Sequence, residues 1–218
     1  MRLPSLSCVL LIAVAALAGA QPSGWQTWSA EQARTVGQSM SASGRVGNRA
    51  TVRLLKTERA ISYKLHATWV TPDVVFASAR LAQLQSRLTD AQTLALVGEA
   101  RGAGDTVVIV DLDPDEGSGV IPLEWEAFLQ PKERPERAVA ATKAPALRDV
   151  LALQGVTRRN YDYDRFWLVF PLTGHDGQPL FTPADHEAEL IVRIYEREGH
   201  VTWRVPSTVR VAPRGPGP

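Results

Sequence analysis

Four acidic side chains gather in the stretch VDLDPDEGSG, residues 110–119, between an apolar run and a group of small residues. Residues two apart in an extended chain point to the same side, so Asp111, Asp113 and Asp115 could present three carboxylates together. Glu116 follows them directly. Carboxylate oxygens are the ligands that calcium prefers, and the spacing of the aspartates matches the beginning of an EF-hand loop. These four residues are therefore candidate metal ligands.

The match to a calcium-binding loop ends early. Glu116 stands where the loop requires its turn glycine, and Pro122 stands where it requires a bidentate glutamate. The alternative is a polar turn after a strand, since Asp, Pro and Gly are ordinary turn residues. The sequence favours the turn and no cofactor, with calcium left open. On this interpretation, replacing Asp111 and Asp113 with Asn would be neutral or slightly stabilising, because it reduces repulsion among neighbouring carboxylates.

A second carboxylate pair, Glu124 and Glu126, lies in IPLEWEAFL, residues 121–129. Two strand steps separate such residues by about 6.6 Å, close to the carboxyl separation of inverting glycosidases. They are therefore candidate catalytic residues for a hydrolase acting on glycan. The alternative is a solvated strand face, which every Glu-x-Glu strand produces. The histidines complete no metal or catalytic motif, and no phosphate or dinucleotide loop occurs in the sequence.

Two tryptophans, Trp25 and Trp28, lie in GWQTWSAEQ near the start of the chain. Aromatic side chains at such a position could stack on a sugar or a partner at the surface. The alternative is that they pack into the body of the domain and fix its terminus. Trp25 and Trp28 are thus candidate ligand-binding residues.

The first twenty residues have the features of a secretory signal peptide. Arg2 supplies a positive charge, residues 9–18 form an apolar run, and Ala18-Gly19-Ala20 has the small-x-small pattern that signal peptidase requires. An apolar run of ten residues is too short to cross a bilayer of about 30 Å. We therefore expect cleavage after Ala20 and an exported chain, periplasmic or extracellular, with no transmembrane segment after cleavage.

Composition narrows the class of protein further. Removal of residues 1–20 takes away Arg2 and the only cysteine, Cys8, so the 24 basic side chains become 23 and balance the 23 acidic ones. An exported chain without cysteine is more typical of a bacterial envelope protein than of a small disulfide scaffold. Basic residues are in excess before residue 101 and acidic ones between 102 and 140, but no concentrated basic stripe occurs. No nucleic-acid partner is expected.

Hydrophobic alternation predicts mostly β-strands. The predicted strands are residues 48–55, 60–70, 106–112, 121–129 and 165–172. Residues 106–112 and 165–172 are apolar on both faces and should be central. In residues 121–129, Leu123 is expected on the buried face. Residues 188–205 predict a hairpin with its turn around Glu198-Gly199.

Two helices are predicted between the strands at 60–70 and 106–112. Thr71, Pro72 and Asp73 have the cap, proline and acid of a helix start. An apolar stripe follows at three- and four-residue steps, formed by Val74, Ala77, Leu81, Leu84 and Leu88. Thr89-Asp90-Ala91-Gln92 has a capping-box pattern that starts the second helix, which should end near Gly102. The helical hairpin, about residues 72–102, should bury its stripe, including Leu84, against a sheet.

These elements predict an α+β fold of mainly antiparallel, β-sandwich-like sheets with an inserted helical hairpin. Residues 21–210 would form a single globular domain, with a proline-rich charged linker loop at 131–146. Residues 211–218 would form a disordered tail. The function expected is that of an exported, soluble, non-enzymatic binding or interaction module of the bacterial cell envelope, with a protein or glycan partner. The alternative is a carboxylate-based hydrolase acting on envelope glycan.

Overall fold

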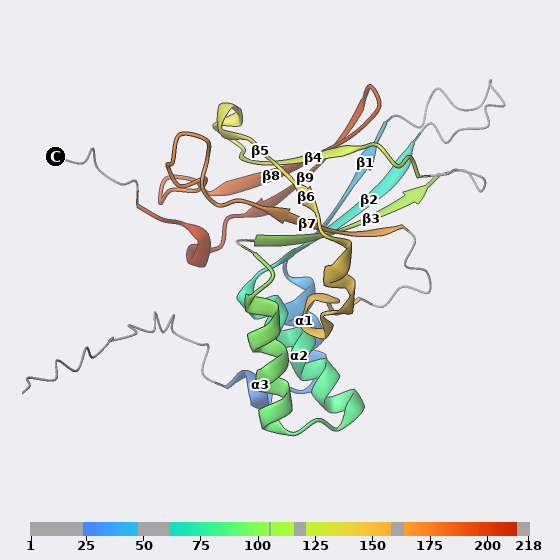
Figure 1. Cartoon of the computed structure of the whole chain (residues 1–218), viewed down its shortest axis with the longest axis vertical. Coiled ribbons are helices and arrows are strands. Elements are labelled where there is room, and N and C mark those ends of the chain that lie inside the picture. Colours follow the sequence, from blue (N-terminus) through green and yellow to red (C-terminus); the bar gives the residue numbers. More distant parts are fainter. Residues whose placement is uncertain (1–23, 48–61, 105, 116–120, 158–163, 213–218) are drawn as a thin grey trace, which may run out of the picture.

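The computed structural model describes residues 24–47, 62–104, 106–115, 121–157 and 164–212. Here two antiparallel sheets pack together, and the α-helices gather on one side of them (Figure 1). The five-stranded sheet has the order β1 (Ser41–Val46), β2 (Tyr63–Val70), β3 (Thr106–Pro114), β7 (Arg165–Phe170) and β6 (Thr142–Lys143). The four-stranded sheet has the order β5 (Val139–Ala140), β4 (Glu126–Pro131), β8 (Glu187–Ile194) and β9 (Arg197–Arg204). The predicted α+β fold with sandwich-like antiparallel sheets is confirmed.

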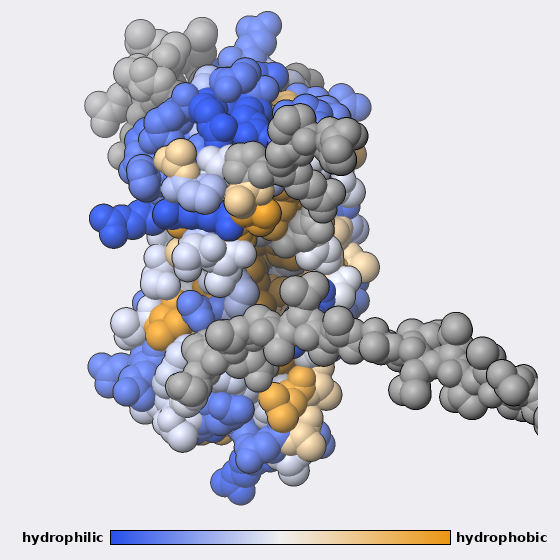
Figure 2. Space-filling view, turned by 90° about the vertical axis from the view of Figure 1, so that its left-hand side faces the viewer, coloured by the Kyte–Doolittle hydropathy of each residue, from blue (hydrophilic) through white to orange (hydrophobic). Residues whose placement is uncertain are grey.

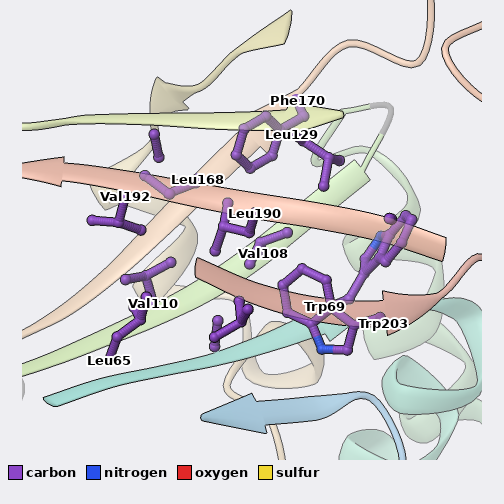
Figure 3. Packing of buried hydrophobic residues seen from close by; sticks show 14 of the residues in the cluster. Leu65, Trp69, Val108, Val110, Leu129, Leu168, Phe170, Leu190, Val192 and Trp203 are labelled. Carbon is purple, nitrogen blue, oxygen red and sulfur yellow. The ribbon is translucent and has the colours of Figure 1, made fainter. Parts of the chain in front are cut away.

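Alternate residues of each strand build the core between the two sheets (Figure 3). Val108 and Val110 of β3 belong to this core, whereas Ile109, which lies between them in the strand, packs with the helices on the opposite face. Trp69 of β2 meets Trp203 of β9 edge to face, with ring centroids 5.8 Å apart. β3 is therefore covered on both faces, which explains why its sequence is apolar throughout.

The C-terminal hairpin of β8 and β9 is confirmed, but its turn lies earlier than predicted. Tyr195 and Glu196 form a two-residue turn between the paired ends of the strands, with Tyr195 at a φ of 54°. Gly199 instead lies inside β9, which contacts β1 of the other sheet. A Cβ atom at Gly199 would lie only 2.6 Å from the carbonyl oxygen of Arg45. This glycine therefore permits a close approach of the two sheets and does not form the turn.

The segment 131–146, predicted as a linker loop, contributes a short strand to each sheet. β5 pairs with β4, and β6 pairs with β7. Between them, the backbone N–H of Ala141 donates to the carbonyl oxygen of Ala127 at 2.9 Å. Short 3-10 turns flank these strands: η3 (Pro135–Arg137), η4 (Pro145–Asp149) and η5 (Leu151–Leu153). The segment thus connects the two sheets directly.

The helical hairpin between β2 and β3 is confirmed as α2 (Pro72–Ser86) and α3 (Asp90–Arg101). Thr89 and Gln92 form the predicted capping box: each backbone N–H donates to the other's side chain, at 2.9 and 3.2 Å. A further helix, α1 (Ala30–Gln38), was not predicted from the sequence, although it begins with the same capping box, formed by Ser29 and Gln32. Ser-x-x-Gln before a helical segment is the signal that would have located it.

α2 is buried on several sides because it contacts α1, α3, η5 and β2. Val74 is buried against the sheet as predicted, whereas Leu81 is buried against residues of α1. Leu84, however, is 41% exposed, and Leu88 is only partly buried. The expected burial of Leu84 is therefore wrong. This residue lies near the end of α2 that points away from the sheets (Figure 1).

A polar cluster around Asp185 fixes the long connection between β7 and β8. The Asp185 carboxylate accepts hydrogen bonds from the backbone N–H and the hydroxyl of Thr182, at 2.6 and 2.8 Å, and from Nε of Arg134 at 3.0 Å. Burial acts to raise the pKa of Asp185, but these hydrogen bonds and the charge of Arg134 together hold it below the usual value of 3.8. The ionised form therefore stabilises the fold.

Figure 2 shows one face of the molecule, on which apolar side chains lie in limited groups among hydrophilic ones. Of the helices in the described residues, none is both long enough and apolar enough to cross a membrane. The predicted signal peptide, residues 1–20, and the strand predicted at 48–55 lie outside the described residues.

Candidate functional site

Asp111 of β3 lies opposite Arg165 of β7, and their side chains form a buried ion pair. Nε of Arg165 donates to Oδ1 of Asp111 at 2.8 Å, and Nη2 donates to Oδ2 at 3.2 Å. The two side chains are 6% and 3% exposed, respectively. The interpretation of Asp111 as part of a polar turn is therefore wrong, and replacing it with Asn is no longer expected to be neutral.

The other described aspartates of this stretch also have basic partners on other strands of the same sheet. Nζ of Lys64 on β2 donates to Oδ2 of Asp113 at 3.1 Å. Asp115 forms an ion pair with Arg45 of β1. Glu116 lies outside the described residues. Within the described part of the chain, no group of three or more His, Cys, Asp or Glu side chains could hold a metal ion. These aspartates therefore belong to separate cross-strand pairs.

Glu124 and Glu126 both lie on the surface. β4 begins at Glu126, so Glu124 precedes the strand, and Leu123, which was expected on the buried face, is 95% exposed. Nη1 of Arg193 lies 3.8 Å from Oε2 of Glu126. Neither glutamate lines the two hollows described below. The structure therefore gives this pair no enclosed site in which to act on a glycosidic bond.

The two tryptophans near the chain start differ in burial. Trp25 is 1% exposed and stacks on Phe76 of α2, with ring centroids 5.2 Å apart and an interplanar angle of 18°. Trp28 is partly buried, and its carbonyl oxygen accepts a hydrogen bond from Nε of Arg80 at 2.9 Å. Trp25 therefore anchors the chain to the helices and offers no face to a sugar.

Arg165 does more than neutralise Asp111, because it also holds the segment 151–157 against the sheet. Its Nη1 donates to the carbonyl oxygen of Gln154 and its Nη2 to that of Thr157, at 3.3 and 3.2 Å. Nε1 of Trp167 donates to the carbonyl oxygen of Leu153 at 2.8 Å. Two buried side chains of β7 thus fix this segment, and a hollow lies on each side of it.

The first hollow, here called the sheet-side hollow, lies between this segment and strands β6 and β7, with a volume of about 460 Å³. Its lining comprises Lys143, Ala144, Pro145, Arg148, Asp149, Gln154, Arg165, Phe166 and Trp167. Lys143 is exposed at the rim, and its Nζ lies 4.3 Å from the ring centroid of Trp125. Phe166 meets the same tryptophan edge to face at 4.9 Å. The hollow therefore combines a cation with aromatic side chains.

Lys143 has an unusual environment for a lysine. Its Nζ donates to the carbonyl oxygen of Leu123 at 3.2 Å, and no carboxylate of the described residues forms an ion pair with it. Partial burial lowers the pKa of Lys143 below its usual value. A group whose charged form lacks full solvation and has no anionic partner gains from a nearby negative charge. Lys143 is therefore the cation in this hollow best placed to attract an anion.

The second hollow, here called the helix-side hollow, lies between the same segment and helices α1 and α2, with a volume of about 560 Å³. Its lining comprises Arg34, Ser78, Leu81, Ala82, Gln85, Leu151, Gln154, Gly155, Val156, Thr157 and Arg165. Arg165 and Gln154 contribute to both hollows. Gly155, at a φ of 71°, provides the tight turn between them.

The linings of the two hollows carry a strong charge bias. Among the described residues, four basic side chains contribute to them, Arg34, Lys143, Arg148 and Arg165, but only one acidic side chain, Asp149. Asp111 behind Arg165 and Asp149 beside Arg148 offset two of these positive charges. Lys143 and Arg34 remain without an ion pair in the described residues. The hollows are thus suited to a negatively charged group.

Sequence reasoning did not identify these lining residues. They come from four separate regions of the chain, and none of them belongs to a motif with fixed spacing. The distribution of charge along the sequence does not locate the hollows, because the basic residues that line them are spread from Arg34 to Arg165. Lys143 lies in the predicted linker loop, and the sequence analysis therefore assigned it to a connection and not to a site.

Comparisons with protein-family models, with curated proteins and with solved structures found no match for this chain. The function proposed below therefore rests on the geometry and charge of the hollows.

Proposed function

We propose that the chain is a non-enzymatic binding module of the bacterial cell envelope, and that the hollows around residues 151–157 bind an anionic ligand such as a carboxylate-bearing glycan. The observation that carries this proposal is the lining of the hollows, to which the described part of the chain contributes four basic side chains and one acidic one. Two of the basic groups, Arg34 and Lys143, have no carboxylate partner in the described residues.

The chemistry of the sheet-side hollow supports an acidic sugar in particular. Sugar rings have apolar faces that pack on aromatic side chains, and the partly buried Phe166 lines this hollow. A carboxylate on the sugar would then pair with Lys143 at the rim. Because partial burial already lowers the lysine's pKa, a bound anion would favour its protonated form and so take up protons. Binding should weaken as the pH rises towards that pKa.

The hydrolase alternative has less support from the described residues. Glycoside hydrolysis requires two carboxyl groups on opposite sides of one bond, separated by about 5 to 9.5 Å. The sheet-side hollow contains the single carboxylate of Asp149, whose Oδ1 lies 3.6 Å from Nε of Arg148. The described residues that line the helix-side hollow include no carboxylate. These linings favour binding without hydrolysis.

Isothermal titration calorimetry with two oligosaccharides tests the proposal. Tetragalacturonate carries a carboxylate on each sugar, whereas maltotetraose is neutral and of the same length. We expect tetragalacturonate alone to bind, with an affinity that falls as salt is added. Lys143→Gln should weaken binding by about tenfold, since a charged hydrogen bond contributes about 1.5–3 kcal/mol. Lys64→Gln is the matched control, because Lys64 pairs with Asp113 and lines neither hollow.

Three results would contradict the proposal. Equal binding of the two oligosaccharides would remove the role of charge, and absence of any binding would leave the acidic-glycan ligand without support. Mass spectrometry of the titrated mixture gives the third: shorter galacturonate products, absent without protein, would favour the hydrolase.

Export is a separate part of the proposal and has its own test. Expression of the full chain in a bacterium, followed by intact-mass measurement of the periplasmic fraction, should give a protein that begins at Gln21. A mass that retains Met1, or that carries a lipid on Cys8, would show that the predicted cleavage after Ala20 is wrong.

A further inference from the structure

Ser78, on the face of α2 that lines the helix-side hollow, has an unsatisfied hydroxyl group. Ser78 is 4% exposed, and its Oγ has no hydrogen-bond partner among the described residues. Leu81, Ala82 and Gln85 follow at the three-, four- and seven-residue steps that share a helix face, and they line the same hollow. A buried hydroxyl without a partner is costly. A polar group within the hollow would remove this cost.

Two guanidinium groups accompany this hydroxyl. Arg165 has five N–H donors, of which Nε, Nη2 and one hydrogen of Nη1 serve Asp111 and the carbonyl groups of Gln154 and Thr157. One Nη1 hydrogen remains without an acceptor in the described residues. Arg34 of α1 is exposed at the rim and has no ion pair there. The polar groups of this hollow are thus predominantly hydrogen-bond donors.

We propose that the helix-side hollow binds one compact oxyanion group, a carboxylate or a phosphate, through the hydroxyl of Ser78 and the guanidinium groups of Arg34 and Arg165. This inference deepens the proposed function and rests on it, because it assigns a second charged group of the ligand, in addition to the one at Lys143, to a specific subsite. An oxyanion has several acceptor lone pairs, which match three donors better than a neutral sugar hydroxyl does. None of the described lining residues carries a carboxylate that would repel it.

The simplest competing explanation is that Ser78 is only a structural imperfection or contacts an ordered water molecule. The two explanations predict different effects of Ser78→Ala. Removing an unpaired hydroxyl from a helix should increase the stability of the free protein, because alanine also has the highest helix propensity. If the hydroxyl binds an anion, the same substitution should also weaken anion binding. Only the subsite predicts both effects together.

The test is a ¹H–¹⁵N NMR titration of the mature chain with sodium acetate in one series and inorganic phosphate in another, at constant ionic strength set by sodium chloride. The backbone amides of Gly155 and Val156 line the hollow and report on its occupancy. We expect the chemical shifts of these amides to change in a saturable way as at least one oxyanion is added. Chloride should cause no such change. The series that saturates at lower concentration identifies whether a carboxylate or a phosphate is preferred.

Three variants complete the experiment. Ser78→Ala and Arg34→Gln should each weaken the oxyanion affinity by about three- to tenfold, as expected for loss of one charge-assisted hydrogen bond or ion pair. Arg148→Gln is the matched control, because it removes a positive charge from the sheet-side hollow alone. Urea denaturation without anion should show Ser78→Ala to be at least as stable as the wild type, which separates lost binding from lost folding.

The inference is overturned by shifts that do not saturate, by an affinity that Ser78→Ala leaves unchanged, or by equal losses in Arg148→Gln and Arg34→Gln. If these results occur while tetragalacturonate still binds in a manner that depends on Lys143, only the oxyanion subsite is wrong. If tetragalacturonate also fails to bind, both the oxyanion subsite and the proposed function are wrong.

Discussion

Asp111→Asn is the substitution that most directly tests the structure at the centre of the site. Asparagine keeps the shape of aspartate but leaves the guanidinium of Arg165 without its counter-charge. The two hydrogen bonds of 2.8 and 3.2 Å would lose their ionic character, and one amide nitrogen would face a donor. Because both side chains are under a tenth exposed, we expect a loss of about 3–5 kcal/mol in the free energy of unfolding.

Asp113→Asn is the matched control, since Asp113 lies two residues further along the same strand. Its partner, Nζ of Lys64, is as close, at 3.1 Å, but the two side chains are 43% and 55% exposed. An exposed pair contributes only about 0–1 kcal/mol. The same chemical change should therefore have a large effect at one position and a small effect at the other, with burial as the main difference between them.

Urea denaturation followed by tryptophan fluorescence measures both effects. With a slope of roughly 2 kcal/mol per molar urea, Asp111→Asn should lower the transition midpoint by about 1.5–2.5 M, and Asp113→Asn by less than about 0.5 M. The loss is smaller than the total stability of about 5–15 kcal/mol expected for a domain, so the variant should still fold. Equal midpoints for Asp111→Asn and the wild type would refute the buried ion pair.

Three further outcomes are expected in the same denaturation assay. Leu84→Ala should cost less than about 1 kcal/mol, whereas Leu81→Ala should cost about 2–5 kcal/mol, because only the second leucine is buried; equal losses would contradict the packing of α2. Gly199→Ala should destabilise the fold by about 1–3 kcal/mol, because its Cβ would meet backbone, while Gly98→Ala, with no atom within 4 Å, should stabilise α3 by about 0.5–1 kcal/mol. The pKa of Asp185 is lower in the folded protein than its usual value of 3.8, so its ionised carboxylate stabilises the fold fully above that value. This stabilisation should be lost as the pH falls through the pKa of the folded state, and Asp185→Asn should remove this pH dependence. An unchanged dependence of stability on acid pH in the variant would contradict the role of Asp185.

The fold was largely predictable because its strands and helices carry local signals. Alternation located β2 and the hairpin of β8 and β9, and the capping box at Thr89 located the start of α3. The turn of the hairpin was misplaced because Gly199 resembles a turn residue, although its function depends on a contact with β1 that lies far away in sequence. In the sequence, a glycine that permits close packing cannot be distinguished from one that permits a turn. Only the three-dimensional contact separates them.

The candidate site was not predictable for a related reason. Asp111 and Arg165 are 54 residues apart, and their pairing depends on the register of β3 against β7, which no spacing in the sequence encodes. Without that register, the acids of β3 resemble a cation-binding loop or a turn. With it, each described aspartate of this stretch has a basic partner on another strand. Arg34 and Lys143, which line the hollows, have no ion pair in the described residues. The sign of the expected ligand therefore reverses, from a metal cation at the acids to an anion at the bases, once the strand pairing is known.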